Sequence, residues 1–164
     1  MQELKDRIVK EGKVLPGNII KVDGFLNHRI DTELMEHIAE EFGRHFNMDE
    51  VTMILTAEAS GIALSAVVAR HFNKPMIFAK KAKSDNIEGG LYQSDIFSYT
   101  YKKKVTLLVS KEWFSSEDRV LIIDDFMANG EAMRGLCDIV EKAGATLVGI
   151  GCAVEKGFQG GGDR

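Results

Sequence analysis

The sequence predicts an α/β domain with a mostly parallel central sheet flanked by helices. Its clearest sign is Val120–Ile123, an unbroken apolar run that is typical of a strand buried on both faces of a parallel sheet. Apolar residues at helical spacing follow this run. The same order of strand and helix is found at Val51–Thr56 and Ile62–Phe72. At 164 residues, the chain is most simply one domain, residues 1–164.

The N-terminal part of the chain predicts two amphipathic helices separated by a short extended segment. Residues 2–11 are rich in helix formers, and Gly12 is suited to end that helix. Pro16 predicts a turn before the extended segment, and Asp23 begins a second turn. From Asp31, which is suited to cap a helix, apolar residues recur at every fourth position, as on a helix that faces a core.

The rest of the chain continues the alternation of strands and helices. Pro75–Ala79 predicts a third strand, and a polar loop with an alternating aromatic segment occupies residues 82–104. Val105–Val109 predicts another strand. After a helix that Gly144 is suited to end, Leu147–Val154 predicts the last parallel strand.

Composition excludes several classes of function. The formal net charge of -4 gives no positive field that would attract nucleic acid. Residues 1–10 are charged throughout, and no run reaches membrane-spanning length, so we expect a cytoplasmic protein without a membrane partner. Cys137 and Cys152 lack metal-ligand spacing and are expected to be small core residues. The histidines form no metal-type pair, so we expect no metal held by protein ligands alone.

Two carboxylates, a loop of small residues and a helix follow the strand at Val120–Ile123. Backbone N–H groups at a helix N-terminus lack intrahelical partners, and the small residues 128–130 would let a phosphate approach them closely. Asp124 and Asp125 are suited instead to accept hydrogen bonds from vicinal sugar hydroxyls. The stretch therefore predicts a sugar-phosphate site, with a polar strand exit and an ordinary turn as the alternative.

Two further segments are candidates for binding an anion or a base. Ser60 and Gly61 lie between a strand and a helix, where free backbone donors suit a pyrophosphate, although most such loops contain Ser or Gly. Lys81 follows a strand, where a lysine is normally solvated. Phe25 and Asn27 could hold a planar base, but the residues alone favour a packed lid in which Asn27 caps its own backbone.

The stretch Val120–Ala132 resembles the phosphoribosyl pyrophosphate (PRPP) signature of the type I phosphoribosyltransferases, and most closely that of the purine-salvage members that act on xanthine. Lys21–His28, Glu58–Ile62 and Glu155–Gln159 resemble the same family in the same order. The resemblance covers essentially the whole chain.

This resemblance implies the type I phosphoribosyltransferase fold. A small hood is expected from residues 1–30 and 155–164, and a flexible flap hairpin from residues 80–104, which would close over the active site and exclude water. Family members continue beyond this length, so we expect a C-terminus that is truncated relative to the family.

The resemblance also implies roles for residues. Lys156 at the end of the last strand can donate to a purine carbonyl, although a basic strand exit would look identical. The implied catalytic residues are Asp124 and Asp125; the PRPP loop is Ala128, Asn129, Gly130, Glu131 and Ala132; the pyrophosphate side is Ser60, Gly61 and Lys81; and the xanthine side is Ile20, Asn27 and Lys156.

The implied activity is that of a pentosyltransferase, which transfers the 5-phosphoribosyl group of PRPP to N9 of xanthine and releases pyrophosphate. Mg²⁺ would be bound mainly through substrate oxygens, and the family implies a homodimer. A hypoxanthine-guanine enzyme is the closest alternative, because the Asn27 amide can rotate to suit either base. The other alternative is a regulator that binds PRPP without catalysis. Such regulators usually carry a DNA-binding domain or a basic face, and neither is seen in the sequence.

Overall fold

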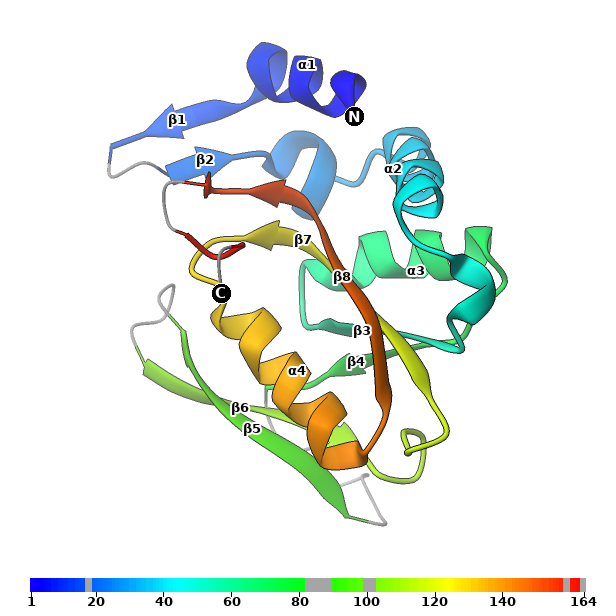
Figure 1. Ribbon diagram of the computed structural model, residues 1–164. Helices are drawn as coiled ribbons and strands as arrows, with labels where there is room; N and C mark the ends of the chain where they lie inside the picture. Colours follow the sequence, from blue (N-terminus) through cyan, green and yellow to red (C-terminus); the bar gives the residue numbers. More distant parts are fainter. Residues whose placement is uncertain (17–18, 82–89, 99–102, 158–159, 163–164) are drawn as a thin grey trace.

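Four parallel strands form the central sheet of the computed structural model, in the order β4-β3-β7-β8 (Figure 1). All three ladders between neighbouring strands are parallel, which confirms the predicted sheet. The strands are β3 (Met53–Ala57), β4 (Met76–Ala79), β7 (Arg119–Met127) and β8 (Thr146–Glu155). The structure describes residues 1–16, 19–81, 90–98, 103–157 and 160–162.

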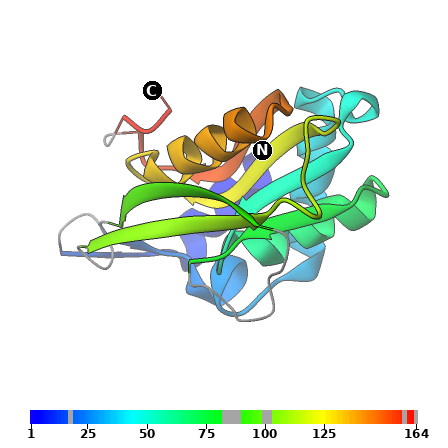
Figure 2. The ribbon, with the colours of Figure 1, turned by 90° about the horizontal axis from the view of Figure 1, so that it is seen from below.

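Helices cover both faces of this sheet. The helices α2 (Thr32–His45) and α3 (Gly61–His71) lie on one face, and α4 (Glu131–Ala143) lies on the other (Figure 1). An antiparallel hairpin of β5 (Leu91–Ser98) and β6 (Lys103–Ser110) packs beside α4, as Figure 2 shows from below. The hairpin lies where the flap is expected, and residues 82–89 and 99–102 of that region lie outside the described part.

The central strand β7 is buried on both faces, which explains why its sequence does not alternate between apolar and polar residues. Val120 and Ile122 pack in the core formed with α4 and the hairpin, whereas Leu121 and Ile123 pack in the core beneath α2 and α3. All four side chains are fully buried, because successive side chains of a strand point to opposite faces and both faces are covered.

The N-terminal elements gather beyond the carboxyl ends of β7 and β8, at the place expected for the hood (Figure 1). They are α1 (Gln2–Glu11), the antiparallel strands β1 (Lys13–Leu15) and β2 (Ile19–Lys21), and a π-helix (Asp23–Asn27). No helix in the described segments is long and apolar enough to cross a bilayer. A short 3-10 helix, Met48–Glu50, precedes β3.

The π-helix replaces the simple turn that the sequence predicts at Asp23. Its Phe25 and Leu26 side chains are fully buried, and the Arg29 N–H donates to the Asp23 carbonyl at 2.8 Å. Burial of two adjacent large apolar side chains outweighs the local preference for a turn, and the backbone winds to allow it.

Two predicted helix boundaries are confirmed by their hydrogen bonds and backbone angles. The Asp31 carboxylate accepts a hydrogen bond from the Leu34 N–H at 3.2 Å, as an N-cap does. Gly144 ends α4 in the left-handed conformation, with φ of 69°. Gly12 also ends its helix, but with φ of -66°, so its backbone is extended there.

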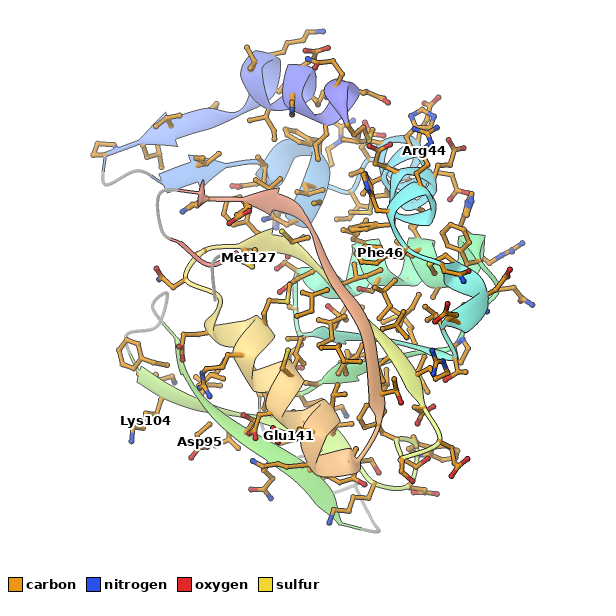
Figure 3. The ribbon with its side chains drawn as sticks, viewed as in Figure 1. Arg44, Phe46, Asp95, Lys104, Met127 and Glu141 are labelled. Carbon is orange, nitrogen blue, oxygen red and sulfur yellow. The ribbon has the colours of Figure 1, made fainter. Side chains whose placement is uncertain are left out.

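Two glycines of β8 let α2 approach the sheet closely. A Cβ on Gly151 would lie 2.5 Å from Cε1 of Phe42, and one on Gly149 would lie 2.6 Å from Cε1 of Phe46. Phe46 follows α2 and reaches toward β8 (Figure 3). These positions therefore need glycine for packing.

The cysteines differ from their expected place in the core. Cys137 and Cys152 are free thiols that lie half-buried at the edge of the core packed by α4. Partial burial raises the pKa of Cys137 and, together with the charge of Glu155, raises that of Cys152 to about 11. Both thiols are therefore poorly reactive at neutral pH.

Candidate active site

A cavity of about 220 Å³ opens at the carboxyl end of β7, where parallel sheets bind ligands. Every residue from Phe126 to Met133 lines it, together with Asp124 and Lys81. The hairpin contributes Ile96 and Phe97 as a further wall. The structure thus brings the whole predicted PRPP loop, one of the two acids and the predicted pyrophosphate lysine to one place.

The loop between β7 and α4 presents helix N-terminal donors to this cavity. Gly130 is the N-cap of α4 and has φ of 75°, a left-handed conformation that glycine adopts most easily. A Cβ at this position would also lie 3.1 Å from the Gly161 carbonyl oxygen. Among the described residues no side-chain hydrogen bond caps the helix at Gly130, as suits a helix N-terminus that binds an anion.

The two acids lie at different places although they are adjacent in sequence. Asp124 lines the cavity and is 8% exposed, and its Oδ1 accepts a hydrogen bond from the Asp125 N–H at 2.9 Å. Asp125 is 1% exposed, and its Oδ1 accepts a hydrogen bond from Ser60 Oγ at 2.8 Å. Its Oδ2 is buried and has no hydrogen-bond partner among the described residues. Asp124 is therefore the acid placed to meet a ligand in the cavity.

The predicted pyrophosphate residues lie beside the acid pair. Ser60 precedes α3, and its hydroxyl is already bonded to Asp125, so it joins the two loops. The helix begins at Gly61, whose backbone approaches Asp124 and Thr56 closely. Lys81 is exposed at the cavity, and its N–H donates to the Glu58 carboxylate at 2.5 Å. The Glu58 contact joins the end of β4 to the loop before α3.

Burial is the main cause of a raised pKa at Asp124. The negative charge of Asp125 also raises this pKa, whereas the Asp125 N–H and the charge of Lys81 lower it, and the resulting pKa is well above the ordinary value. A bound cation or a donor hydroxyl would favour the charged form. The free site therefore holds an acid that is costly to ionise without a ligand.

We expect the Asp124→Asn variant to be more stable than the wild type at neutral pH. A carboxyl whose pKa is raised by folding contributes stability below its unfolded pKa, and this contribution is lost as the pH rises through the folded pKa. The melting temperature of the wild type should therefore fall relative to that of the variant from about pH 4 upward, since the ordinary pKa is 3.8. Melting curves from pH 4 to 8 measure this difference. Parallel pH profiles of the two proteins would contradict it.

The residues predicted to bind xanthine lie in the hood and at the end of β8. They are outside the described lining of the cavity. Lys156 donates its N–H to the Met127 carbonyl at 2.9 Å, and its Nζ lies 5.2 Å from the centroid of the Phe126 ring. Ile20 on β2 packs against the same core as Phe126. Asn27 is half-buried at the end of the π-helix, and no hydrogen bond of its side chain is seen among the described residues, so the backbone cap is not observed.

Sequence reasoning missed Phe126. This ring lines the cavity directly after the acid pair and lies beneath the Lys156 ammonium group, so it connects the sugar side to the predicted base side. The sequence signal that could have identified Phe126 is an aromatic residue directly after the two acids, near the end of a predicted strand. Phe158 follows Lys156 closely in sequence and has a ring that could stack on a purine, but it lies outside the described residues.

The parallel sheet, the phosphate-type loop and the acid pair together define a phosphoribosyltransferase domain. A family described as "Phosphoribosyl transferase domain" matches residues 22–162, and the chain belongs to this family.

Among its relatives, the xanthine phosphoribosyltransferase of Bifidobacterium adolescentis is 52% identical over an alignment of 165 positions, which covers 100% of this chain and 86% of the relative. That of Lachnoclostridium phytofermentans is 54% identical over 163 residues, 99% of this chain and 84% of the relative.

Solved structures agree on the fold. The adenine phosphoribosyltransferase of Trypanosoma brucei, solved with AMP, pyrophosphate and ribose-5-phosphate, has a TM-score of 0.78 at 23% identity and covers 98% of this chain and 70% of that one. The adenine phosphoribosyltransferase of Saccharomyces cerevisiae has a TM-score of 0.80 at 16% identity, with coverage of 99% and 94%. The predicted type I phosphoribosyltransferase fold is thereby confirmed.

Proposed function

We propose that this protein transfers the 5-phosphoribosyl group of PRPP to N9 of xanthine, giving xanthosine 5'-monophosphate and pyrophosphate in purine salvage. The cavity supports the sugar-phosphate half of this proposal, because the loop before α4 and Asp124 line the same space. The xanthine half is supported by relatives of that name at about half identity over nearly the whole chain.

Different residues around the cavity would bind different parts of PRPP in this reaction. The N-terminal N–H groups of α4 would bind the 5-phosphate, and Asp124 would accept hydrogen bonds from the ribose hydroxyls. As the bond from C1 to pyrophosphate breaks, positive charge spreads over the sugar, and the nearby carboxylates stabilise it. Lys81 would meet the pyrophosphate. Alignment of the base, C1 and leaving group can contribute on the order of 7 to 11 kcal/mol.

The base would lie on the Lys156 side of the cavity. Lys156 Nζ can donate to a purine carbonyl, and the Phe126 ring beneath it offers an apolar surface to the purine. Asn27 in the hood has an amide without a described partner, and Ile20 would pack against the ring. A dioxopurine presents carbonyl oxygens and ring N–H groups that match these donors and acceptors.

We also propose that Mg²⁺ accompanies PRPP. Across the described residues, no three His, Cys, Asp or Glu side chains come together as a metal site. Few carboxylates line the described cavity, and Asp124 is the buried one among them. These side chains suit an ion that takes most of its oxygen ligands from the substrate. When bound, Mg²⁺ would neutralise the leaving pyrophosphate. We further propose that the protein forms a homodimer, as the family resemblance implies.

A steady-state panel of four bases tests the substrate. With PRPP and Mg²⁺, we expect kcat/KM for xanthine to exceed that for guanine, hypoxanthine or adenine by about 100-fold, because a site built to hydrogen-bond one base leaves polar groups unpaired with another. The Lys156→Met variant should raise KM for xanthine more than KM for PRPP. A preference for hypoxanthine or guanine would favour the hypoxanthine-guanine alternative. Tight PRPP binding without turnover of any base would favour the regulator.

A further inference from the structure

The hairpin strand β5 has an edge that no strand covers in the described part of the chain. It pairs with β6 along its other edge, from Leu91 opposite Ser110 to Ser98 opposite Lys103. An uncovered edge presents unpaired backbone groups to its surroundings. Here the neighbour is α4, which runs alongside the hairpin (Figures 1 and 2).

Side chains of α4 bond to alternate residues along this edge. Lys142 Nζ donates to the Gln93 carbonyl at 2.7 Å, and Arg134 Nη2 donates to the Asp95 carbonyl at 2.7 Å. The Phe97 N–H donates to Glu131 Oε2 at 3.3 Å. Residues 93, 95 and 97 direct their backbone groups to the same side of a strand, so α4 acts here as a side-chain partner for the edge. Figure 3 shows Asp95 on the hairpin beside α4.

Apolar side chains also pack between α4 and the hairpin. A Cβ on Gly135 of α4 would lie 2.9 Å from Leu107 Cδ1 and still closer to Ile96 Cγ2. Ile96 is 5% exposed, and Leu107 is fully buried. The helix and the hairpin therefore meet without a gap, and the polar contacts select one register between them.

Glu131 is the unusual member of this contact, because it is an acid in the first turn of a helix that is proposed to bind phosphate. Its carboxylate would repel a phosphate dianion if it faced one. Instead Oε2 accepts hydrogen bonds from the Phe97 N–H and from Arg134 Nη2, each at 3.3 Å. Arg134 thus bridges Glu131 and the Asp95 carbonyl. The bridge joins the phosphate loop to the hairpin wall of the cavity, which Ile96 and Phe97 form.

We propose that Glu131 and Arg134 are positioning residues that hold β5 in place as one wall of the PRPP cavity. Both residues bond to β5, and both belong to α4, the helix whose N-terminus would bind the 5-phosphate. The attachment of β5 and the binding of PRPP are therefore coupled. Coupling of this kind is reciprocal, so PRPP also strengthens the attachment of the hairpin. This inference rests on the proposed function only for the identity of the ligand.

The test measures amide hydrogen exchange and PRPP affinity in the same variants. Arg134→Met removes the bridge, Glu131→Ala removes the acceptor, and Glu131→Gln keeps an oxygen that can accept from Phe97. Arg44→Met is the matched control, because Arg44 forms an i,i+3 pair with Glu41 on α2, at 2.7 Å, away from the cavity (Figure 3).

We expect Arg134→Met and Glu131→Ala to speed exchange of the Phe97 amide without ligand and to weaken PRPP binding about 10-fold by calorimetry, since a charge-assisted contact is lost. KM for xanthine should change less than about 2-fold, Glu131→Gln should lie between Glu131→Ala and the wild type because it keeps the acceptor and loses the charge, and Arg44→Met should resemble the wild type. PRPP should slow the exchange of the Phe97 amide in the wild type and in Arg44→Met, and much less in Arg134→Met and Glu131→Ala.

Unchanged exchange and unchanged PRPP affinity in both Arg134→Met and Glu131→Ala would overturn the inference, as would faster exchange with wild-type affinity. A wild-type protein that does not bind PRPP would overturn the proposed function instead. The exchange of the Phe97 amide without ligand still reports on the attachment in that case.

Discussion

Changing Asp124 or Asp125 to asparagine should lower kcat/KM roughly 100- to 1,000-fold each, the cost of removing one preorganised electrostatic group from an active site. Asparagine has nearly the shape of aspartate, so each change removes charge and leaves packing intact. In Asp124→Asn the new amide oxygen can still accept from the backbone N–H of residue 125, and in Asp125→Asn it can still accept from Ser60 Oγ. The lost property is the charge that we propose stabilises the sugar cation.

The rate of pyrophosphate release with xanthine and PRPP measures this effect. Asp49→Asn is the matched control, because Asp49 is exposed on the 3-10 helix and should keep its rate within about 2-fold. Melting curves separate loss of function from loss of fold, and the Asp124→Asn variant is expected to be nearly inactive yet more stable at neutral pH. Turnover at the wild-type rate in a variant that carries both Asp124→Asn and Asp125→Asn would exclude the proposed role of the acid pair.

Gly61→Ala should remove activity and also destabilise the fold. A Cβ at this first residue of α3 would lie 2.5 Å from Asp124 Oδ1 and closer still to Thr56 Oγ1. Thr56 is fully buried and Asp124 nearly so, and a shift of either side chain would disturb its packing. Overpacking of this kind typically costs about 1 to 3 kcal/mol. The acid would also be displaced from the cavity.

The melting temperature should therefore fall by roughly 2 to 12 °C, given about 2 to 4 °C for each kcal/mol in a domain of this size. The matched control is Gly24→Ala, because a Cβ on Gly24 would meet nothing within 4 Å. We expect this control to melt like the wild type. If Gly61→Ala kept both the melting temperature and kcat, the close approach of α3 to the acid pair would not matter for function.

Some features were predictable because their cause is local. The strand at Val120–Ile123, the cap at Asp31 and the helix end at Gly144 each depend on residues within one turn or one strand, and the structure confirms all three. The loop at residues 128–130 was also predictable, because small residues are typical of a turn between a strand and a helix, and its role toward an anion stays a prediction.

Other features were not predictable because they join distant parts of the chain. Ser60 was expected to face pyrophosphate, and the structure shows its hydroxyl bonded to Asp125, 65 positions away. Glu131 was expected only as part of the PRPP loop, and its carboxylate bonds to the hairpin. The π-helix at Asp23–Asn27 forms because buried contacts of Phe25 and Leu26 override a local turn.

Short-range patterns of polarity, size and charge were enough to predict the alternation of strands and helices in the parallel sheet, and the resemblance of several motifs predicted the family. Which groups meet depends instead on how the whole chain packs. The parallel ladder from β4 to β8 brings the loops that follow its strands to one edge, and it buries Asp124 there. Burial beside Asp125 then raises the Asp124 pKa, a property that no local pattern contains.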